Sequence, residues 1–310
     1  MARGRCLSGV WAIAAAALLA ACGSNRSESP PAASPPADAC PTAPVEVVVS
    51  VDQWGDIVSE LGGACARVTT VLASSSIDPH DYEPVPADAA AFSGAQLIVI
   101  NGADYDHWAA DLAATVAPAA PIIDAAAVTD TAEGANPHLW YSAPAVIAVA
   151  DAVTAELSRI DAGAADFFAA RRSAFTTAMQ PYSDLTATIK ASAAGKSYAA
   201  TESIFDYQAR ALGLVNKTPE GYRRAAASDT EPSPADIGAF RNILASREVD
   251  VLIYNTQTQG SIPEQIRTAA EQSRVPVVDV TETVPPGETS FFDWQNRQLT
   301  ALAEALGVRG

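Results

Sequence analysis

The chain has 310 residues, of which 49% are hydrophobic and 18% charged, and this is enough to bury two cores of ordinary domain size. Its formal net charge of -17 argues against a nucleic acid as partner and favours long-range attraction of cations. An acidic surface also serves solubility, so the charge alone does not assign a function.

Residues 1–21 have the pattern of an export signal. Arg3 and Arg5 precede an apolar run that ends in Leu-Ala-Ala-Cys at Cys22. The run is shorter than the about 20 apolar residues of a membrane span, and small residues before a cysteine are typical of a lipoprotein signal. We therefore expect a mature protein that starts at a lipidated Cys22, lies outside the cytoplasm on the cell membrane, and has a disordered tether over 22–42. A plain signal peptide or a short anchor helix is the alternative.

The remaining cysteines of the mature chain are Cys40 and Cys65. Each lies a few residues before a predicted strand, so two neighbouring parallel strands would bring them together at one end of a sheet. In an oxidising compartment such a pair predicts a structural disulfide. A pair of metal-bound thiolates is the alternative.

Residues 43–142 alternate between β-branched apolar runs and amphipathic segments, which predicts a first α/β lobe with a parallel sheet. The run Val45–Val51 is almost continuously apolar, as is typical of a strand buried on both faces. The predicted elements are strands Val45–Val51, Val68–Leu72, Gln96–Asn101 and Pro121–Asp124, with helices over about Trp54–Leu61, from Pro86, and over about Trp108–Val116.

Residues 143–193 contain no convincing strand and predict a helical segment. Apolar residues at helical spacing indicate one helix over about Val146–Leu157 and a longer one over about Phe167–Ile189. A helix of about 25 residues spans about 38 Å, which is enough to link two lobes. We expect one long, rigid helix that makes a stiff hinge.

Residues 194–310 resume the alternation and predict a second α/β lobe. The predicted fold class is therefore α/β, with two parallel-sheet lobes joined by one long rigid α-helix. The predicted elements are strands Lys196–Thr201, Leu214–Lys217, Val249–Tyr254 and Val275–Val280, and helices Phe205–Ala211, Pro234–Ser246, Pro263–Gln272 and Phe291–Leu306.

Two of the three histidines directly follow a proline in the first lobe. His80 stands in the motif D-P-H after a predicted strand, and His138 stands in N-P-H. Proline fixes its own φ and restricts the residue before it, so each imidazole is presented by a stiff backbone. Either histidine alone could equally be a polar loop residue or a hydrogen-bonded core residue.

Two glutamates directly follow strands of the second lobe. Glu202 follows Lys196–Thr201 and Glu282 follows Val275–Val280. Ligands of open α/β sheets bind at the carboxyl ends of strands, so we expect His80, His138, Glu202 and Glu282 to converge if the lobes face each other. Two neutral imidazoles and two carboxylates neutralise one divalent cation, and they suit Zn2+, or Mn2+ and iron if a carboxylate binds through both oxygens. Each glutamate alone could instead cap a helix.

Other polar residues near these positions have weaker claims. We expect His107, at the start of a helix, to face solvent. Asp78, Asp81 and Glu83 are candidates to accept a hydrogen bond from a ligating imidazole or to form an acidic rim.

Several motifs together resemble the zinc/manganese solute-binding lipoproteins of ABC transporters, the helical-backbone type of metal receptor. The resemblance covers essentially the whole mature chain and is carried by DPHDYEP at 78–84, NPHLW at 136–140, TESIFDY at 201–207, EPS at 231–233, TET at 281–283 and the helix with Trp294.

This resemblance implies two lobes on a backbone helix, and one Zn2+ or Mn2+ between them that is delivered to a membrane permease with its cytoplasmic ATPase. We expect the protein to be a monomer. Matched position by position, it assigns the metal ligands to His80, His138, Glu202 and Glu282. A carboxylate at the third position and the histidine-free segment 124–136 favour manganese, whereas the usual order of affinities favours zinc.

Two other functions fit part of the pattern. A metallohydrolase would hold catalytic zinc with two histidines and a carboxylate, but four protein ligands leave no open position for water. A surface adhesin with an incidental metal site would also be lipidated. We therefore expect a binding protein and no enzymatic activity.

Overall fold

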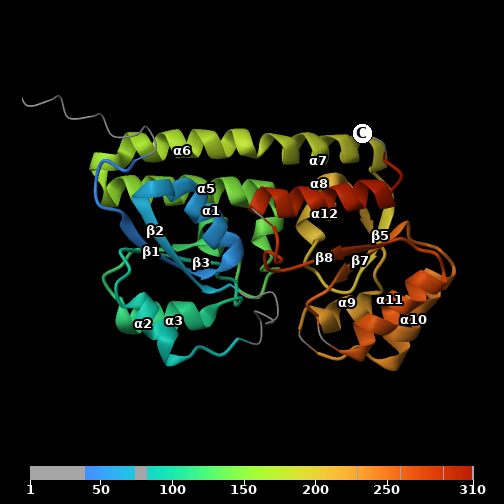
Figure 1. Cartoon of the computed structure of the whole chain (residues 1–310). Coiled ribbons are helices and arrows are strands. Elements are labelled where there is room, and N and C mark those ends of the chain that lie inside the picture. Colours follow the sequence, from blue (N-terminus) through green and yellow to red (C-terminus); the bar gives the residue numbers. More distant parts are fainter. Residues whose placement is uncertain (1–38, 74–81, 229, 259, 289, 309–310) are drawn as a thin grey trace, which may run out of the picture. The chain divides into compact units, whose positions relative to one another are not determined.

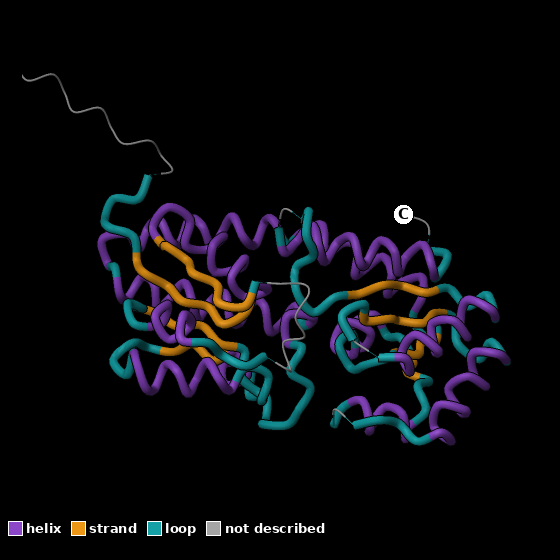
Figure 2. Tube along the Cα trace, turned by 60° about the horizontal axis from the view of Figure 1, so that its bottom comes forward, coloured by secondary structure: helices purple, strands orange, loops and turns teal. Residues whose placement is uncertain are grey.

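The computed structural model describes residues 39–73, 82–228, 230–258, 260–288 and 290–308. They form two parallel β-sheets flanked by helices (Figure 1 and Figure 2). The first part contains β1 Val45–Val51, α1 Asp52–Gly62, β2 Ala66–Leu72, α2 Pro86–Phe92, β3 Leu97–Ile100, α3 His107–Val116, β4 Ile122–Asp124, α4 Ala125–Val128 and the 3-10 turn η3 Leu139–Tyr141. The helical middle contains α5 Ala143–Ile160, α6 Ala165–Ala178 and α7 Gln180–Ala193. The last part contains β5 Ser197–Ala200, α8 Asp206–Leu212, β6 Val215–Asn216, α9 Glu220–Ala226, α10 Pro234–Ala245, β7 Val251–Asn255, α11 Ser261–Gln272, β8 Val277–Val280 and α12 Phe291–Ala305.

Both sheets are parallel throughout and have the same strand order. The first runs β2-β1-β3-β4 and the second β6-β5-β7-β8. The order therefore reverses between β1 and β3 in the first sheet and between β5 and β7 in the second. Loops at such a reversal diverge at the carboxyl ends of the strands and leave room for a ligand. The predicted α/β class with two parallel-sheet lobes is confirmed.

Alternate residues of the strands pack into different cores because each sheet is covered on both faces. In the first sheet, Val47 and Val49 belong to the same buried cluster as residues of α1 and α5, whereas Val48 and Ile98 belong to a second cluster with Trp108. Because both faces of the sheet are covered, almost every residue of β1 is buried.

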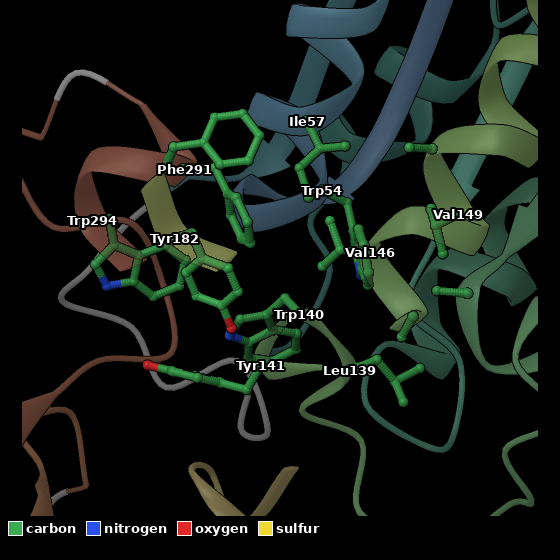
Figure 3. Close-up of a cluster of buried hydrophobic side chains, with 14 of the residues drawn as sticks. Trp54, Ile57, Leu139, Trp140, Tyr141, Val146, Val149, Tyr182, Phe291 and Trp294 are labelled. Atoms are coloured by element: carbon green, nitrogen blue, oxygen red, sulfur yellow. The ribbon is translucent and has the colours of Figure 1, made fainter. Parts of the chain in front are cut away.

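One core is shared by the two lobes. A single cluster of buried residues runs from Trp54 of α1 to Trp294 of α12, and Figure 3 shows their side chains gathered around Trp140, Tyr141 and Tyr182. The Tyr141 ring lies 6.0 Å from that of Trp294 and 5.5 Å from that of Phe205, centre to centre. Separating the lobes widely would expose these rings to water at a cost of about 25 cal/mol per Å2 of apolar surface.

The long linking helix is present but bent. Instead of one continuous helix over 167–189, the structure has α6 and α7, separated at Met179. Pro181 explains the break, because proline has no N–H to donate to the carbonyl of Thr177 and its ring clashes with that carbonyl. The bonds from Met179 N–H to Phe175 O and from Ser183 N–H to Met179 O still connect the two helices at 3.0 Å each, so they run end to end (Figure 1).

All eight predicted strands occur, with ends that differ by up to two residues. Two short helices, α4 and α9, were not predicted. Among the residues that the structure describes, no helix is long and apolar enough to cross a bilayer. The predicted signal and Cys22 lie outside these residues.

A disulfide joins Cys40 and Cys65, whose Cα atoms are 4.9 Å apart. It lies at the amino ends of β1 and β2, which pair in parallel from Val45 and Ala66 onward.

Two aspartates of α1 hold the segment that connects β8 to α12. Asp52 accepts a 3.2 Å hydrogen bond from the backbone N–H of Val284, and Asp56 accepts one from the N–H of Phe291 at the start of α12. Burial raises the pKa of Asp52 to about 7, and the nearby charge of Asp56 acts in the same direction, while the bond from Val284 opposes it. The first lobe thus contacts the second through carboxylates that are costly to ionise.

Replacing both Cys40 and Cys65 with alanine should lower the free energy of unfolding by about 3 kcal/mol, because the bond closes a loop between cysteines 25 residues apart. Urea unfolding followed by tryptophan fluorescence measures this difference. A reductant should bring the wild-type midpoint to that of the double variant and leave the variant unchanged. Equal midpoints before reduction would contradict the prediction.

The Asp52→Asn variant should be more stable than the wild type at pH 8, by on the order of 1 kcal/mol. The folded protein keeps its proton on Asp52 up to about pH 7, whereas the unfolded chain loses it near its ordinary pKa of about 3.9. Wild-type stability therefore falls as the pH rises through this window, and asparagine removes that fall while still accepting the bond from Val284. Urea titrations at pH 5 and pH 8 test this, with Asp111→Asn on the exposed side of α3 as the control for one lost charge. A variant with the same pH dependence as the wild type would refute it.

Candidate metal site

Two glutamates and one asparagine lie together at the carboxyl edge of the second sheet. Glu202 follows β5, Glu282 follows β8, and Asn255 is the last residue of β7, the strand between them. Glu282 and Asn255 are each 1% exposed, and Glu202 is partly buried. Because the strands are parallel, their last residues meet at the same edge, and the middle strand places Asn255 between the two acids.

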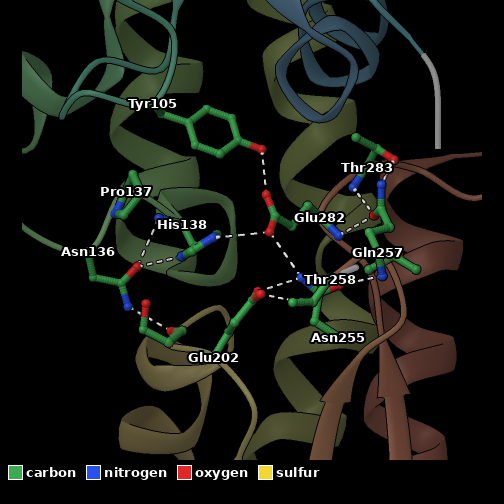
Figure 4. Close-up of polar contacts among 12 residues, drawn as sticks. Tyr105, Asn136, Pro137, His138, Glu202, Asn255, Gln257, Thr258, Glu282 and Thr283 are labelled. Carbon is green, nitrogen blue, oxygen red and sulfur yellow. Dashed lines mark hydrogen bonds and ion pairs between the residues drawn. The ribbon is translucent and has the colours of Figure 1, made fainter. Parts of the chain in front are cut away.

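The Asn255 side chain bridges the two carboxylates. Its Nδ2 donates to Oε2 of Glu202 at 2.6 Å and to Oε1 of Glu282 at 3.0 Å (Figure 4). The orientation of this amide is determined, since its Oδ1 accepts a 3.0 Å bond from the backbone N–H of Gln257. We call the two oxygens bonded to Asn255 the inner oxygens.

Hydroxyl groups hold the two remaining carboxylate oxygens, which we call the outer oxygens. Tyr105, after β3 in the first lobe, donates to Oε2 of Glu282 at 3.0 Å. Thr258, after β7, donates to Oε1 of Glu202. Each of the four carboxylate oxygens thus accepts a hydrogen bond from a protein side chain.

The two carboxylates repel each other, and this affects the pKa of Glu202. Burial raises the pKa of Glu202, and the charge of Glu282 raises it further. The hydrogen bonds from Thr258 and Asn255, and the proximity of His138, act in the opposite direction. A cation placed between the two acids would remove this repulsion.

His138 lies near Glu282, and Asn136 sets which ring nitrogen of its neutral form carries the hydrogen. The Oδ1 of Asn136 accepts from the backbone N–H of His138 at 3.0 Å, and its Nδ2 donates to the carbonyl of Ser203 at 2.7 Å. These contacts determine which amide atom is oxygen, so Nδ1 of His138, 2.8 Å from that oxygen, carries a proton. A neutral His138 then presents the lone pair of Nε2, the form in which imidazole binds a metal.

The distance between His138 and Glu282 suits two ligands of one ion. His138 Nε2 lies 3.7 Å from Oε1 of Glu282, and both side chains are almost fully buried. Two donors at about 2.1 Å from a tetrahedral zinc lie about 3.4 Å apart. The inner oxygen of Glu282 and Nε2 of His138 are therefore close enough to contact one ion.

Side chains from both lobes hold the Glu282 loop in place. The Oε1 of Gln257 accepts from the backbone N–H groups of Glu282 at 2.6 Å and of Thr283 at 3.0 Å, and Asp52 accepts from that of Val284. Three successive N–H groups are thereby bonded to side chains, which restricts the position of the Glu282 carboxylate.

Three of the four predicted metal ligands are described, and His80 lies outside the described residues. Within the described part of the chain, no three histidine, cysteine or acidic side chains are close enough to hold a metal, because Glu202 reaches the His138–Glu282 pair through Asn255. His107 is exposed at the start of α3, as predicted. Glu83 is also exposed, and Asp78 and Asp81 fall outside the described residues.

Sequence reasoning missed four polar residues of this site: Tyr105, Asn136, Asn255 and Thr258. The acceptor for His138 was expected among nearby acids and is instead the amide of Asn136, two residues away in the same motif. Asn255 had a usable signal, since it directly follows a predicted strand, as the two glutamates do. Tyr105 had none, because it contacts Glu282 across 177 residues of sequence.

Three comparisons relate this chain to known proteins. Residues 47–305 match the model of the family described as zinc-uptake complex component A, periplasmic, or ZnuA. The high-affinity zinc uptake system protein ZnuA of Bacillus subtilis is 22% identical over 77% of this chain and 81% of its own length. The manganese ABC transporter substrate-binding lipoprotein PsaA of Streptococcus pneumoniae is 23% identical over 84% of this chain and 89% of its own.

A match to part of another relative and a solved structure also point to metal-binding proteins. The manganese-binding lipoprotein MntA of Halalkalibacterium halodurans is 27% identical over 44% of this chain, which corresponds to 46% of that protein. The Mn2+ complex of the binding protein FpvC from Pseudomonas aeruginosa has the same fold, with a TM-score of 0.69 and 20% identity over 86% of this chain and all of that one. The family match covers most of the chain and both lobes, so this chain belongs to the ZnuA family of periplasmic zinc-uptake components.

Proposed function

We propose that this chain captures one divalent transition-metal ion outside the cytoplasm and delivers it to an ABC permease. The observation that carries the proposal is the arrangement of His138 Nε2 and Glu282 Oε1 at 3.7 Å, with Glu202 linked to them through Asn255. These donors come from both lobes and meet at the strand ends where α/β sheets bind ligands.

The charge of the site favours a divalent cation. Two buried carboxylates close together are costly to keep ionised, and a divalent ion compensates both. Nitrogen and oxygen donors together suit Zn2+ and Mn2+. His80 is proposed as the further ligand, so that two imidazoles and two carboxylates give a neutral cluster with the ion.

Both metals occur in the names of the relatives, and we propose that both bind here. Zinc should bind more tightly in vitro, because the usual order of affinities places Zn2+ above Mn2+ for such donors. Which metal the cell supplies then decides the physiological cargo.

We further propose that Cys22 carries a lipid that holds the protein at the outer side of the cell membrane. The pattern of residues 1–22 supports this, and relatives such as PsaA and MntA are named as lipoproteins. The permease and its ATPase are the proposed partners, since PsaA is named as part of an ABC transporter. We propose that the protein acts as a monomer.

Release of the ion should involve small movements. The core shared by the lobes and the helices α6 and α7 resist wide separation of the two sheets. We therefore propose that loops at the site shift while the lobes move slightly.

The metal content of the mature protein tests this function directly. The domain purified without added metal should contain a transition metal by elemental analysis, and the metal-free form should bind one Zn2+ or Mn2+ per chain in calorimetry. The Glu202→Gln and Glu282→Gln variants should each bind zinc at least about 100-fold more weakly, because each removes a charged ligand next to the remaining one. Glu156→Gln on α5, which lies on the surface beside Arg159, is the matched control. Wild-type affinity in both site variants would show that the ligands are wrongly assigned.

The Asn136→Leu variant should weaken zinc binding by about 10- to 100-fold, because His138 loses the acceptor that sets its tautomer and ring orientation. Asn136→Asp keeps an acceptor for Nδ1 and should recover most of the affinity. Competition with a chromogenic chelator measures both, with Asn242→Leu on the exposed side of α10 as the control. Equal effects of leucine and aspartate at position 136 would argue against this role.

A further inference from the structure

The two outer oxygens of the site are held by hydroxyl groups from different lobes. Tyr105 bonds Oε2 of Glu282, and Thr258 bonds Oε1 of Glu202. Neither residue has a group that would bind the ion well itself, and the proposed capture of a metal assigns them no role.

The direction of the Tyr105 bond follows from its partners. An ionised carboxylate can only accept, so the single hydroxyl hydrogen of Tyr105 goes to Glu282. The tyrosine oxygen then accepts from Nε2 of Gln53, which lies 3.3 Å away. Tyr105 is 2% exposed and its ring packs 5.1 Å from that of Trp140, so its hydroxyl has little freedom to move.

These bonds fix the rotation of each carboxylate. The outer oxygen of Glu282 points to Tyr105, and only its inner oxygen faces His138 Nε2 (Figure 4). On the other acid, Asn255 bonds the inner oxygen and Thr258 the outer one. To place both oxygens on one ion, either carboxylate would have to rotate, and this would move its outer oxygen away from the hydroxyl that holds it.

Cations differ in how many ligand atoms they prefer, so the number of oxygens that each carboxylate supplies affects which cation binds best. Zinc is satisfied by four donors in a tetrahedron. Manganese and magnesium prefer six ligands, and calcium takes six to eight, often with carboxylates bound through both oxygens. A site in which each glutamate offers one oxygen therefore favours zinc.

We propose that Tyr105 and Thr258 set the metal preference of this site, by restricting Glu282 and Glu202 to one metal-binding oxygen each. They are positioning residues that act through the two glutamates. This inference rests on the proposed metal capture and adds to it a preference for four-coordinate cations.

The test uses variants that remove only the hydroxyl groups. Tyr105→Phe and Thr258→Val keep the shape of each side chain, and the double variant frees both outer oxygens. Dissociation constants for Zn2+ and Mn2+ are measured by chelator competition on the metal-free mature protein. We expect the ratio of manganese to zinc affinity to rise in each single variant and by at least tenfold in the double variant.

Cobalt provides a second readout that a general loss of structure would not mimic. Four-coordinate Co2+ absorbs visible light more strongly than five- or six-coordinate Co2+. The wild-type cobalt complex should show the strong bands of a tetrahedral site, and the double variant should show weaker ones. Thermal unfolding of the metal-free variants verifies that they are folded.

Tyr198→Phe is the matched control, because it removes a 2.7 Å hydroxyl–carboxylate bond to Asp206 away from the proposed ligands. It should leave the affinity ratio and the cobalt spectrum unchanged. If the wild type binds metals but the double variant keeps the wild-type ratio and spectrum, the inference is overturned while metal capture stands. If the wild type binds neither zinc nor manganese, both are overturned.

Discussion

The site depends on keeping two buried carboxylates side by side. Glu202 and Glu282 repel each other, and Asn255 makes their proximity tolerable by donating one amide hydrogen to each. Asn255 can do this because it ends β7, which lies between β5 and β8 in the sheet. Glu202 follows β5 and Glu282 follows β8. The parallel sheet thereby holds a repulsive pair together at the place where we propose that a cation binds, and the family of the chain is one of metal-uptake components.

The rest of the molecule limits how far this site can change. The first lobe reaches across with His138, Tyr105 and Asp52, and each contacts Glu282 or the loop that carries it. Behind these contacts, the aromatic core from Trp54 to Trp294 belongs to both lobes. Opening the lobes as rigid halves would break the polar contacts and expose the shared core together. A binding protein built in this way is better suited to small adjustments at the site than to wide closure around its cargo.

The structure also explains why the ligands alone do not define the metal. Histidine and glutamate at these positions are compatible with zinc and with manganese. What separates the two ions is the number of oxygens that each carboxylate can turn toward the metal. We propose that in this chain the number depends on the hydroxyl groups of Tyr105 and Thr258.

The amino-acid sequence by itself predicted the eight strands, the two-lobe α/β architecture and the proximity of His138, Glu202 and Glu282 at the strand ends, whereas their role as metal ligands with His80 stays a proposal. Periodicity of apolar residues and the ends of strands are local features, and the rule that parallel strands end at one edge extends them to the site. The bend at Met179 also has a local cause in the sequence, because Pro181 interrupts an otherwise continuous helical pattern. The tertiary structure alone decided the bridge by Asn255 and the contact of Tyr105 with Glu282, because these partners are 27 to 177 residues apart and only packing of the sheets and lobes determines which polar groups meet.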